Sequence, residues 1–379
     1  MAVVVPCRNK QDTIYEVLES VINQSYRPLK IVVTDDYSTD RSLDEIIRFA
    51  KDYFGGVTCV KVSENEEICR GNVKYHDTEF ILVKHLKENL GKSKSLNAMI
   101  SMIDEEYELV ATIDADTKLD REWIWNSLKY HKDLDVAATF GWVRLWDDKS
   151  CGLLKSVRRF EYNFLLPIYR EVMNPRSHWT MSGSNILYKT SIVKKFPIPE
   201  HLKENAGEDL LHTVILQSMG YKVIFVSEAL AYSKEELDFG SFVKQSRRWF
   251  KGTWYVLFNT VFNDKNLEGN LTFLHRLQIG SVFIMPYYYF ILDFAFMYGL
   301  ITLNFSILIW PFIDFLIYFV LSLVGYYKNR KYLEKTNLVE LIKLYPQYYF
   351  LRQMLLIPYF ISLKDYINIK KSNNLITYT

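Results

Sequence analysis

Two short acidic motifs follow apolar segments of the chain and are the first candidates for chemistry. Asp114 and Asp116 come directly after Leu-Val-Ala-Thr-Ile, and Asp35 and Asp36 close the segment Lys-Ile-Val-Val-Thr. A carboxylate at such a place can hold Mg²⁺ or Mn²⁺ while the ion bridges a diphosphate, and another can contact a base or ribose. The same acids can equally be turn or cap residues, so each motif taken singly leaves both interpretations open.

A glycine followed by lysines and an asparagine lies at positions 89–97. In Asn-Leu-Gly-Lys-Ser-Lys-Ser-Leu-Asn, Gly91 provides a turn, Lys92 and Lys94 begin a helix, and Asn97 closes the motif. Backbone N–H groups at a helix start, together with an ammonium group, suit the binding of an anion. A plain helix start with exposed lysines is an equally open alternative.

A carboxylate that could serve as a base stands at the start of another helix. Gly207-Glu208-Asp209 precedes apolar residues at helical spacing. When a group is transferred to a hydroxyl, one base must take the proton of the attacking oxygen, and Asp209 is suited to that role. A carboxylate at this place can also be no more than a favourable partner of the helix dipole.

The segment Gln245-Ser-Arg-Arg-Trp249 lies shortly before the most apolar part of the chain. In a functional interpretation, Arg248 contacts a diphosphate and Trp249 stacks on a sugar ring. In the alternative, the segment is a basic and aromatic helix that rests on lipid headgroups.

The elements expected to position these residues alternate strands with helices. Short β-rich runs and helical patterns follow each other over residues 1–235, which is typical of an α/β sheet. The first helix is expected over residues 12–24, with Thr13 and Glu16 as a capping box. Residues 63–78 are polar and are expected to form an irregular surface insertion. Ligands of open parallel sheets bind beyond the carboxyl ends of the strands, which is where both acidic motifs lie.

Two long apolar segments follow, at about 277–303 and 305–327. Each has the roughly 20 residues needed to cross a bilayer, and a buried core helix is a poor alternative for two consecutive segments of this length. The basic loop after them predicts that this loop and the domain before the spans face the cytoplasm. The segment at about 338–363 is either an interfacial helix or a third span, and its charged residues Lys343 and Arg352 favour the interfacial helix. The predicted organisation is therefore a catalytic domain, an amphipathic interfacial segment and a membrane region, at residues 1–235, 236–276 and 277–379.

Composition excludes one class of partner and suggests the state of the cysteines. The 46 basic and 44 acidic side chains give a net charge of +2, so nucleic acid is not a favoured partner. The four cysteines Cys7, Cys59, Cys69 and Cys151 are far apart in the sequence. We expect reduced thiols in a cytosolic domain, not zinc ligands or disulfides.

Taken together and in this order, the motifs resemble those of glycosyltransferase family 2, which has the GT-A fold. The chain is most similar to the branch that contains cellulose, hyaluronan and poly-N-acetylglucosamine synthases. The resemblance covers residues 2–255 by motif. It implies that Asp209 is the catalytic base and Asp116 the metal ligand. The implied donor-binding residues are Asp36, Lys92, Asn97, Asp114 and Arg248. The implied acceptor-binding residues are Ser182, Gly183, Ser184, Gln245 and Trp249.

The resemblance implies an inverting enzyme with Mg²⁺ or Mn²⁺ as cofactor and a nucleotide-sugar, by preference a UDP-sugar, as donor. The acceptor is either a growing polysaccharide or a polyprenyl-phosphate or other lipid-linked glycan. A non-catalytic membrane subunit that binds nucleotide-sugar is the alternative from another class. The expected location is the cell membrane, with several spans and with membrane lipid as a partner.

This sequence departs from the family pattern at three points. Lys10 stands where an acidic residue often follows the asparagine, and Gly207 replaces the usual threonine. The apolar segments are fewer than in polymer-exporting synthases, so we expect long products to need a homo-oligomer or a partner subunit. Asp293 and Asp314 lie near the middle of the two segments and are expected either to pair with tyrosines or with each other, or to line a polar path.

Overall fold

The computed structural model describes residues 1–27, 29–146, 152–174, 177–200, 207–234, 238–263, 267, 269–333, 338–352 and 356–371. The chain divides into two compact units, which are described separately. The first comprises Met1–Trp146, Arg176–Glu204 and Glu208–Glu235, and the second comprises Asp147–Pro175, Asn205–Gly207 and Glu236–Thr379. The second unit thus takes in a segment that the sequence-based boundary at residue 235 assigns to the catalytic domain.

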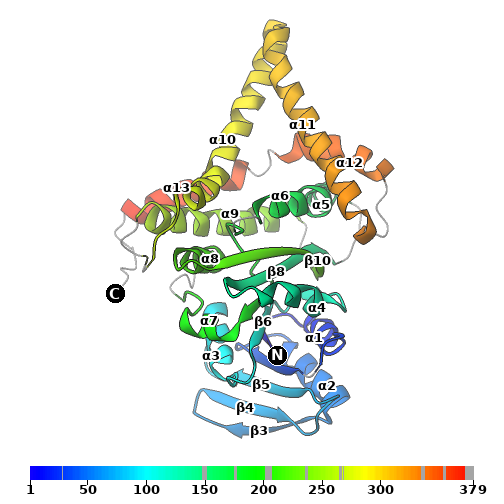
Figure 1. The fold of residues 1–379 in the computed structure, drawn as a ribbon, viewed down its shortest axis with the longest axis vertical. Coiled ribbons are helices and arrows are strands. Elements are labelled where there is room, and N and C mark those ends of the chain that lie inside the picture. Colours follow the sequence, from blue (N-terminus) through cyan, green and yellow to red (C-terminus); the bar gives the residue numbers. More distant parts are fainter. Residues whose placement is uncertain are drawn as a thin grey trace. The chain divides into compact units, whose positions relative to one another are not determined.

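A ten-stranded mixed sheet forms the frame of the first unit (Figure 1), in the order β3-β4-β5-β2-β1-β6-β9-β8-β10-β7. The strands are β1 (Ala2–Cys7), β2 (Lys30–Asp35), β3 (Val57–Lys61), β4 (Glu66–Gly71), β5 (Glu79–His85), β6 (Leu109–Ile113), β7 (Thr117–Leu119), β8 (Val136–Leu145), β9 (Asn185–Lys189) and β10 (Lys222–Ser233). The helices are α1 (Ile14–Ile22), α2 (Ser42–Phe54), α3 (Lys92–Ser101), α4 (Trp123–Leu128), η1 (Lys129–Lys132), α7 (Thr190–Lys195) and α8 (Glu208–Ser218).

Four neighbouring strands of this sheet run parallel, because β1 pairs in parallel with both β2 and β6, and β2 pairs in parallel with β5. Their carboxyl ends therefore meet at one edge of the sheet. Every residue of β2 and β6 is buried, which explains why β6 and the middle of β2 (Ile31, Val32 and Val33) do not alternate polar with apolar residues. The predicted α/β sheet, with its acidic motifs at the carboxyl ends of strands, is observed.

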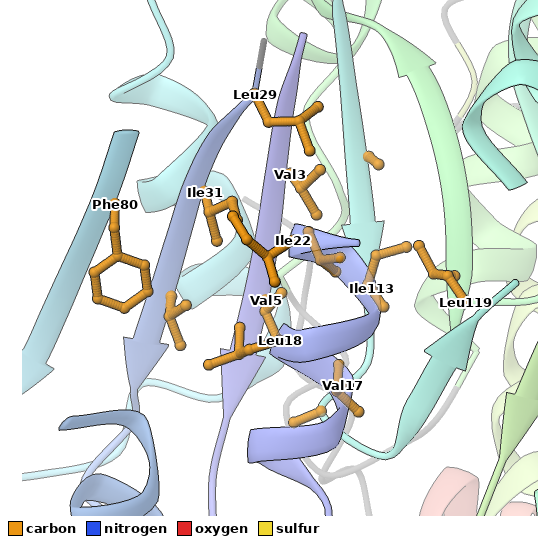
Figure 2. Close-up of a cluster of buried hydrophobic side chains, with 14 of the residues drawn as sticks. Val3, Val5, Val17, Leu18, Ile22, Leu29, Ile31, Phe80, Ile113 and Leu119 are labelled. Carbon is orange, nitrogen blue, oxygen red and sulfur yellow. The ribbon is translucent and has the colours of Figure 1, made fainter. Parts of the chain in front are cut away.

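The apolar side of this sheet is covered by α1. Val17, Leu18 and Ile22 of the helix belong to one buried cluster with Val3 and Val5 of β1 (Figure 2). All five side chains are 0% exposed. The apolar side chains of α1 lie on one face of the helix and pack against the valines of β1. This packing holds the helix against the first strand.

Two expectations for the edge of the sheet are wrong. The predicted surface insertion at 63–78 contains β4, which pairs antiparallel with both β3 and β5. Cys59 and Cys69 are not reduced thiols but are joined by a disulfide. The register places them directly opposite each other on β3 and β4. A pairing set by strand register could not be seen from their separation in the sequence.

The predicted capping box at the start of α1 is also wrong. Thr13 makes no side-chain cap bond to the helix. Its hydroxyl instead donates a hydrogen bond to the backbone oxygen of Ala115, at 2.7 Å. Thr13 therefore anchors the loop after β6, and tertiary contact overrides the local capping pattern.

The described elements of the second unit are helical. They are α5 (Leu153–Phe160), η2 (Glu161–Leu165), α6 (Leu166–Met173), α9 (Phe239–Val256), η3 (Leu257–Val261), α10 (Phe273–Thr302), α11 (Phe305–Asn329), η5 (Arg330–Tyr332), α12 (Leu338–Leu351) and α13 (Leu356–Lys371). Two stretches in the described part of the chain, Ile284–Thr302 and Phe305–Tyr332, are long and apolar enough to cross a membrane. The region of the expected third segment holds the described helices α12 and α13, of 14 and 16 residues.

Asp314 lies inside this helical unit and is fully paired. Its carboxylate accepts hydrogen bonds from Tyr288 at 2.9 Å and Tyr349 at 2.8 Å, and forms a salt bridge with Arg352 at 2.6 Å. The side chains of Arg352 and Asp314 are 1% and 4% exposed. The expected pairing of Asp314 with tyrosines is confirmed. Arg352, whose charge favoured an interfacial position in the sequence, is buried because Asp314 neutralises it.

Candidate active site

Asp36, just beyond β2, organises the turn that carries the first lysine of the site. Its buried carboxylate accepts hydrogen bonds from His85 Nδ1 at 2.8 Å and from the backbone N–H groups of Leu90 at 2.7 Å and Gly91 at 2.9 Å. Burial raises the pKa of Asp36, but these donors outweigh it and hold the pKa below its usual range. Asp36 thus stabilises the loop that contains Leu90 and Gly91. Its expected contact with base or ribose stays a prediction.

The turn fixed by Asp36 places Lys92 at the start of α3. Gly91 has a φ of +85°, a conformation that favours glycine. The Lys92 ammonium lies 2.6 Å from a carboxylate oxygen of Asp114, 3.8 Å from Glu208, and donates to the backbone oxygen of Gly183 at 3.1 Å. Burial lowers the pKa of Lys92, but the carboxylates of Asp114 and Glu208 raise it overall. Lys92 therefore stays positively charged.

The acidic motif after β6 meets a second lysine. Asp114 is bonded through its backbone N–H to the oxygen of Ser184 at 2.9 Å, and burial raises its pKa, while Lys92 opposes this rise. The Lys10 ammonium lies 2.6 Å from Oδ2 of Asp116. Each acid of the motif thus has its own ammonium partner, Lys92 on Asp114 and Lys10 on Asp116.

The residues around this motif fit a hard divalent cation. Carboxylate oxygens are the ligands that Mg²⁺ and Mn²⁺ prefer, and such ions are commonly held by one or two carboxylates together with phosphate oxygens and water. Among the described residues, Cys59, Glu67 and Cys69 place three ligand atoms close together elsewhere. The two sulfurs there are joined in the disulfide and offer no thiolate. Asp114 and Asp116 are therefore the better candidates.

Asp209, the predicted base, lies at the start of α8 against the segment 182–185. Its Oδ2 accepts a hydrogen bond from the backbone N–H of Gly183 at 3.1 Å, and its Oδ1 accepts from Leu210 N–H at 2.7 Å. A Cβ atom at Gly183 would lie 3.1 Å from Asp209 Oδ2, so any larger residue there would push the carboxylate out of its place by a few tenths of an ångström. Burial and the neighbouring charge of Glu208 raise the pKa of Asp209 to about 6, although Lys92 and the two N–H groups lower it. This is the range that suits a general base near neutral pH.

Two serines flank Gly183 and complete this wall of the site. The hydroxyls of Ser182 and Ser184 are 3.2 Å apart and hydrogen bonded to each other. Both side chains are partly exposed. They are available to an acceptor, and their predicted acceptor role stays a prediction.

Asn185, the last residue of the segment 182–185 that the family resemblance places beneath the acceptor, makes a buried polar contact that the sequence did not predict. Asn185 is 0% exposed, and its side-chain oxygen accepts hydrogen bonds from Gly141 N–H at 2.7 Å and from Trp123 Nε1 at 3.1 Å. A Cβ at Gly141 would lie 2.2 Å from the backbone oxygen of Ala229, so only glycine fits. Asn185 thereby joins β9, β8 and α4 and fixes the serine segment that precedes it. The adjacent Ser-Gly-Ser motif was the available signal.

Glu208 was also missed as a member of the charged cluster. It precedes the predicted base and faces Lys92, and its charge raises the pKa of Asp209. Asn97 has a different setting from the one expected. Its amide donates to the backbone oxygen of Ile198 and to Glu200, both at 2.8 Å. These contacts tie α3 to the segment before residue 201, and no described contact tests the donor-binding role.

The Gln-x-x-Arg-Trp motif lies on α9 in the second unit. The helix begins at an N-cap, Asp238, whose side chain accepts from Ser241 N–H at 2.9 Å. Gln245 is half-buried and Arg248 is exposed. The Trp249 ring, 38% exposed, has the Arg158 guanidinium 5.9 Å from its centroid. The structure brings Asp36, Lys92, Asp114, Asp116, Asp209 and Ser182–Ser184 into one unit, and the α9 residues belong to the other.

Comparison with known proteins identifies the family. The model of glycosyltransferase-like family 2 matches residues 1–252. The poly-β-1,6-N-acetyl-D-glucosamine synthase of Staphylococcus epidermidis is 25% identical over 355 residues, which cover 90% of this chain and 78% of that protein. The synthase of the same name from Staphylococcus aureus strain MSSA476 is 26% identical over 259 residues, covering 68% of this chain and 55% of its own.

A solved structure supports the fold. The mannosyltransferase PcManGT from Pyrobaculum calidifontis, determined with GDP-Man and Mn²⁺, superposes with a TM-score of 0.58 over 97% of this chain and 86% of its own. At 14% identity this likeness concerns the fold alone. The predicted α/β GT-A domain followed by apolar C-terminal helices is thereby confirmed. The chain belongs to glycosyltransferase-like family 2 and is a GT-A glycosyltransferase.

Proposed function

We propose that the protein is an inverting membrane glycosyltransferase that moves a sugar from a nucleoside-diphosphate sugar, by preference a UDP-sugar, to a growing polysaccharide. The observation that carries this proposal is the placement of Asp209. Its carboxylate, with a pKa raised to about 6, belongs to one cluster with the two lysine–aspartate pairs at the end of β6.

The proposed chemistry needs one base for the acceptor hydroxyl and one positively charged site that stabilises the leaving diphosphate. Asp209 takes the proton of an acceptor hydroxyl, and the hydroxyl oxygen attacks the anomeric carbon from the face opposite the diphosphate. The bond from that carbon to the diphosphate oxygen breaks, and the electron pair leaves with the nucleoside diphosphate. Lys92 offers its charge to the leaving group, with Arg248 as a further candidate. A single displacement of this kind inverts the anomeric configuration.

A divalent cation would be held by Asp116, with Asp114 beside it on the donor side. When bound, Mg²⁺ or Mn²⁺ neutralises charge on the diphosphate. Gly183 and the flanking serines lie against Asp209, so we assign the acceptor hydroxyl to this wall of the site. Trp249 and Gln245 are proposed to hold the acceptor sugar, with Trp249 as the stacking surface.

Polysaccharide is the preferred acceptor because the relatives named above are polysaccharide synthases. The second candidate is a single transfer to a polyprenyl-phosphate or other lipid-linked glycan. We propose that the two apolar stretches cross the cell membrane. The basic residues Lys328, Arg330 and Lys331 at the end of the second stretch favour placing that end, and the catalytic domain, on the cytoplasmic side.

The test is transfer by purified protein in lipid vesicles, supplied with a panel of labelled nucleotide-sugars and Mg²⁺ or Mn²⁺. UDP-N-acetylglucosamine is the first donor to try, and we expect labelled product that grows in length with time. A product limited to one added sugar on lipid would favour the second candidate. If no nucleotide-sugar is consumed, the catalytic proposal fails, and a non-catalytic nucleotide-sugar-binding subunit becomes the better interpretation.

A further inference from the structure

Lys10 is held beside the acidic motif by both of its backbone polar groups. Its N–H donates to the hydroxyl of Ser42 at 2.6 Å, and its backbone oxygen accepts from the N–H groups of Thr13 and Ile14, both at 3.0 Å. Thr13 in turn donates to the backbone oxygen of Ala115, inside the acidic motif, at 2.7 Å. The loop that carries Lys10 is thus fixed to the loop that carries Asp116.

This fixed loop brings a positive charge to the predicted metal ligand. The Lys10 ammonium lies 2.6 Å from Asp116 Oδ2, across 106 positions of the sequence. The two side chains are 41% and 24% exposed, so the pair is open to solvent. A half-exposed ion pair of this kind is weak enough to break, because water screens it.

An ammonium group and a divalent cation compete for the same carboxylate oxygen, because each needs it as an acceptor and the two cations repel each other. A metal ion that takes Oδ2 of Asp116 must therefore displace Lys10. The four-carbon stem of lysine lets the ammonium move while the backbone stays fixed. The diphosphate of a bound donor would bring new negative charge to this site, and the displaced ammonium would be attracted to it.

We propose that Lys10 is a movable internal cation of the donor site. It neutralises Asp116 before the donor and metal bind, and it passes to the donor diphosphate when the metal takes the carboxylate. This inference rests on the proposed function, because it presumes a diphosphate donor and a metal ion at Asp116. Lys10 is a positioning and donor-binding residue in this scheme and takes no proton from the acceptor.

The scheme has a signature that a merely structural lysine would not produce. Replacing Lys10 by methionine removes the competitor for Asp116, so affinity for the metal alone should rise. The same change removes a partner of the diphosphate, so affinity for UDP in the presence of metal should fall. Each effect should be about 1.5- to 5-fold, the range expected when a partly exposed charge contact is lost.

The experiment uses the purified full-length protein in detergent. Mn²⁺ binding without donor is measured by electron paramagnetic resonance of the free ion, and UDP binding at fixed Mn²⁺ by calorimetry. Lys10→Met is compared with Lys10→Arg, which keeps the charge and should stay near the wild type in both readouts. Lys87→Met is the matched control, because Lys87 pairs with Glu64 on the exposed surface, at 2.9 Å, and should change neither readout.

Tighter Mn²⁺ together with weaker UDP in Lys10→Met supports the proposal. Unchanged or weaker Mn²⁺ binding, or unchanged UDP binding, overturns it while leaving the metal site and the proposed function intact. If Mn²⁺ binds neither the wild type nor Lys10→Met, with or without UDP, the metal assignment fails and this inference fails with it. Asp116→Asn shows that the measured ion is the one at this site, because it should abolish Mn²⁺ binding in both backgrounds.

Discussion

Replacing Asp209 by asparagine removes the basicity of the proposed base and keeps its size. Asparagine can still accept one hydrogen bond through its oxygen, from either Gly183 N–H or Leu210 N–H, which Asp209 holds at 3.1 and 2.7 Å. It can no longer take a proton from the acceptor. Turnover should therefore fall ~10²–10⁴-fold, the usual contribution of a general base, while donor affinity changes little.

The pKa of Asp209 also predicts the pH dependence of the wild type. Burial and Glu208 raise it to about 6, so the carboxylate gains a proton as pH falls through that value. The acid limb of kcat/KM should accordingly lie near pH 6. The pKa of Asp209 in the folded state lies above the ordinary value of 3.8, so the fold disfavours the charged carboxylate. The contribution of this group to the free energy of unfolding therefore increases as pH falls through about 6, whereas activity decreases.

The assay is initial-rate transfer to a hydroxyl acceptor over pH 5–8, with UDP affinity measured on the same preparations. Glu208→Gln is the matched control. It removes the neighbouring charge and should move the acid limb to lower pH without removing the base. Turnover of Asp209→Asn within a few-fold of the wild type would refute the assignment, and so would an acid limb that Glu208→Gln leaves in place.

Three further outcomes are expected. Asp116→Asn should lose metal-dependent nucleotide binding, and EDTA should stop transfer by the wild type; full activity in chelator would contradict the metal assignment. Gly183→Ala should lower turnover at least ~10-fold, because its Cβ would lie 3.1 Å from Asp209 Oδ2 and displace the base; unchanged kinetics would show that the close approach is unimportant. Arg352→Met should destabilise the protein by about 3–5 kcal/mol, since it leaves the buried Asp314 carboxylate without its ionic partner. Thermal unfolding in detergent measures this loss, and adding Asp314→Asn should restore much of it; an unchanged unfolding temperature for the single variant would refute a stabilising role.

The local patterns of the sequence predicted the strands and the residues at their ends, because those depend on apolar runs and short motifs. Asp114, Asp116 and Asp209 follow from this reasoning. The partners of these residues did not, because Lys10 reaches Asp116 only after the sheet brings the β1 and β6 ends together. Such pairs are far apart in the sequence and cannot be predicted from local patterns. Comparison with the family pattern identified Lys10 only as a residue that differs from the acidic one often found there.

The same limit explains the wrong expectations at the edge of the sheet. Cys59 and Cys69 become neighbours through the register of β3 and β4, which no spacing rule predicts. Arg352 similarly looked like a charge suited to an interface, because its burial depends on Asp314, a residue of another helix. Long-range pairing between polar groups decided each of these positions.

The anomeric configuration of the newly formed bond tests the assignment of Asp209 as the base of a single displacement. Purified protein is supplied with an isotopically labelled nucleotide-sugar, and the product linkage is read by nuclear magnetic resonance. The proposed mechanism predicts that every new linkage has the configuration opposite to that of the donor, and that Asp209→Asn forms the linkage ~10²–10⁴-fold more slowly. A product that retains the donor configuration would contradict the mechanism. Retention requires two displacements at the anomeric carbon, and the proposed mechanism has only one.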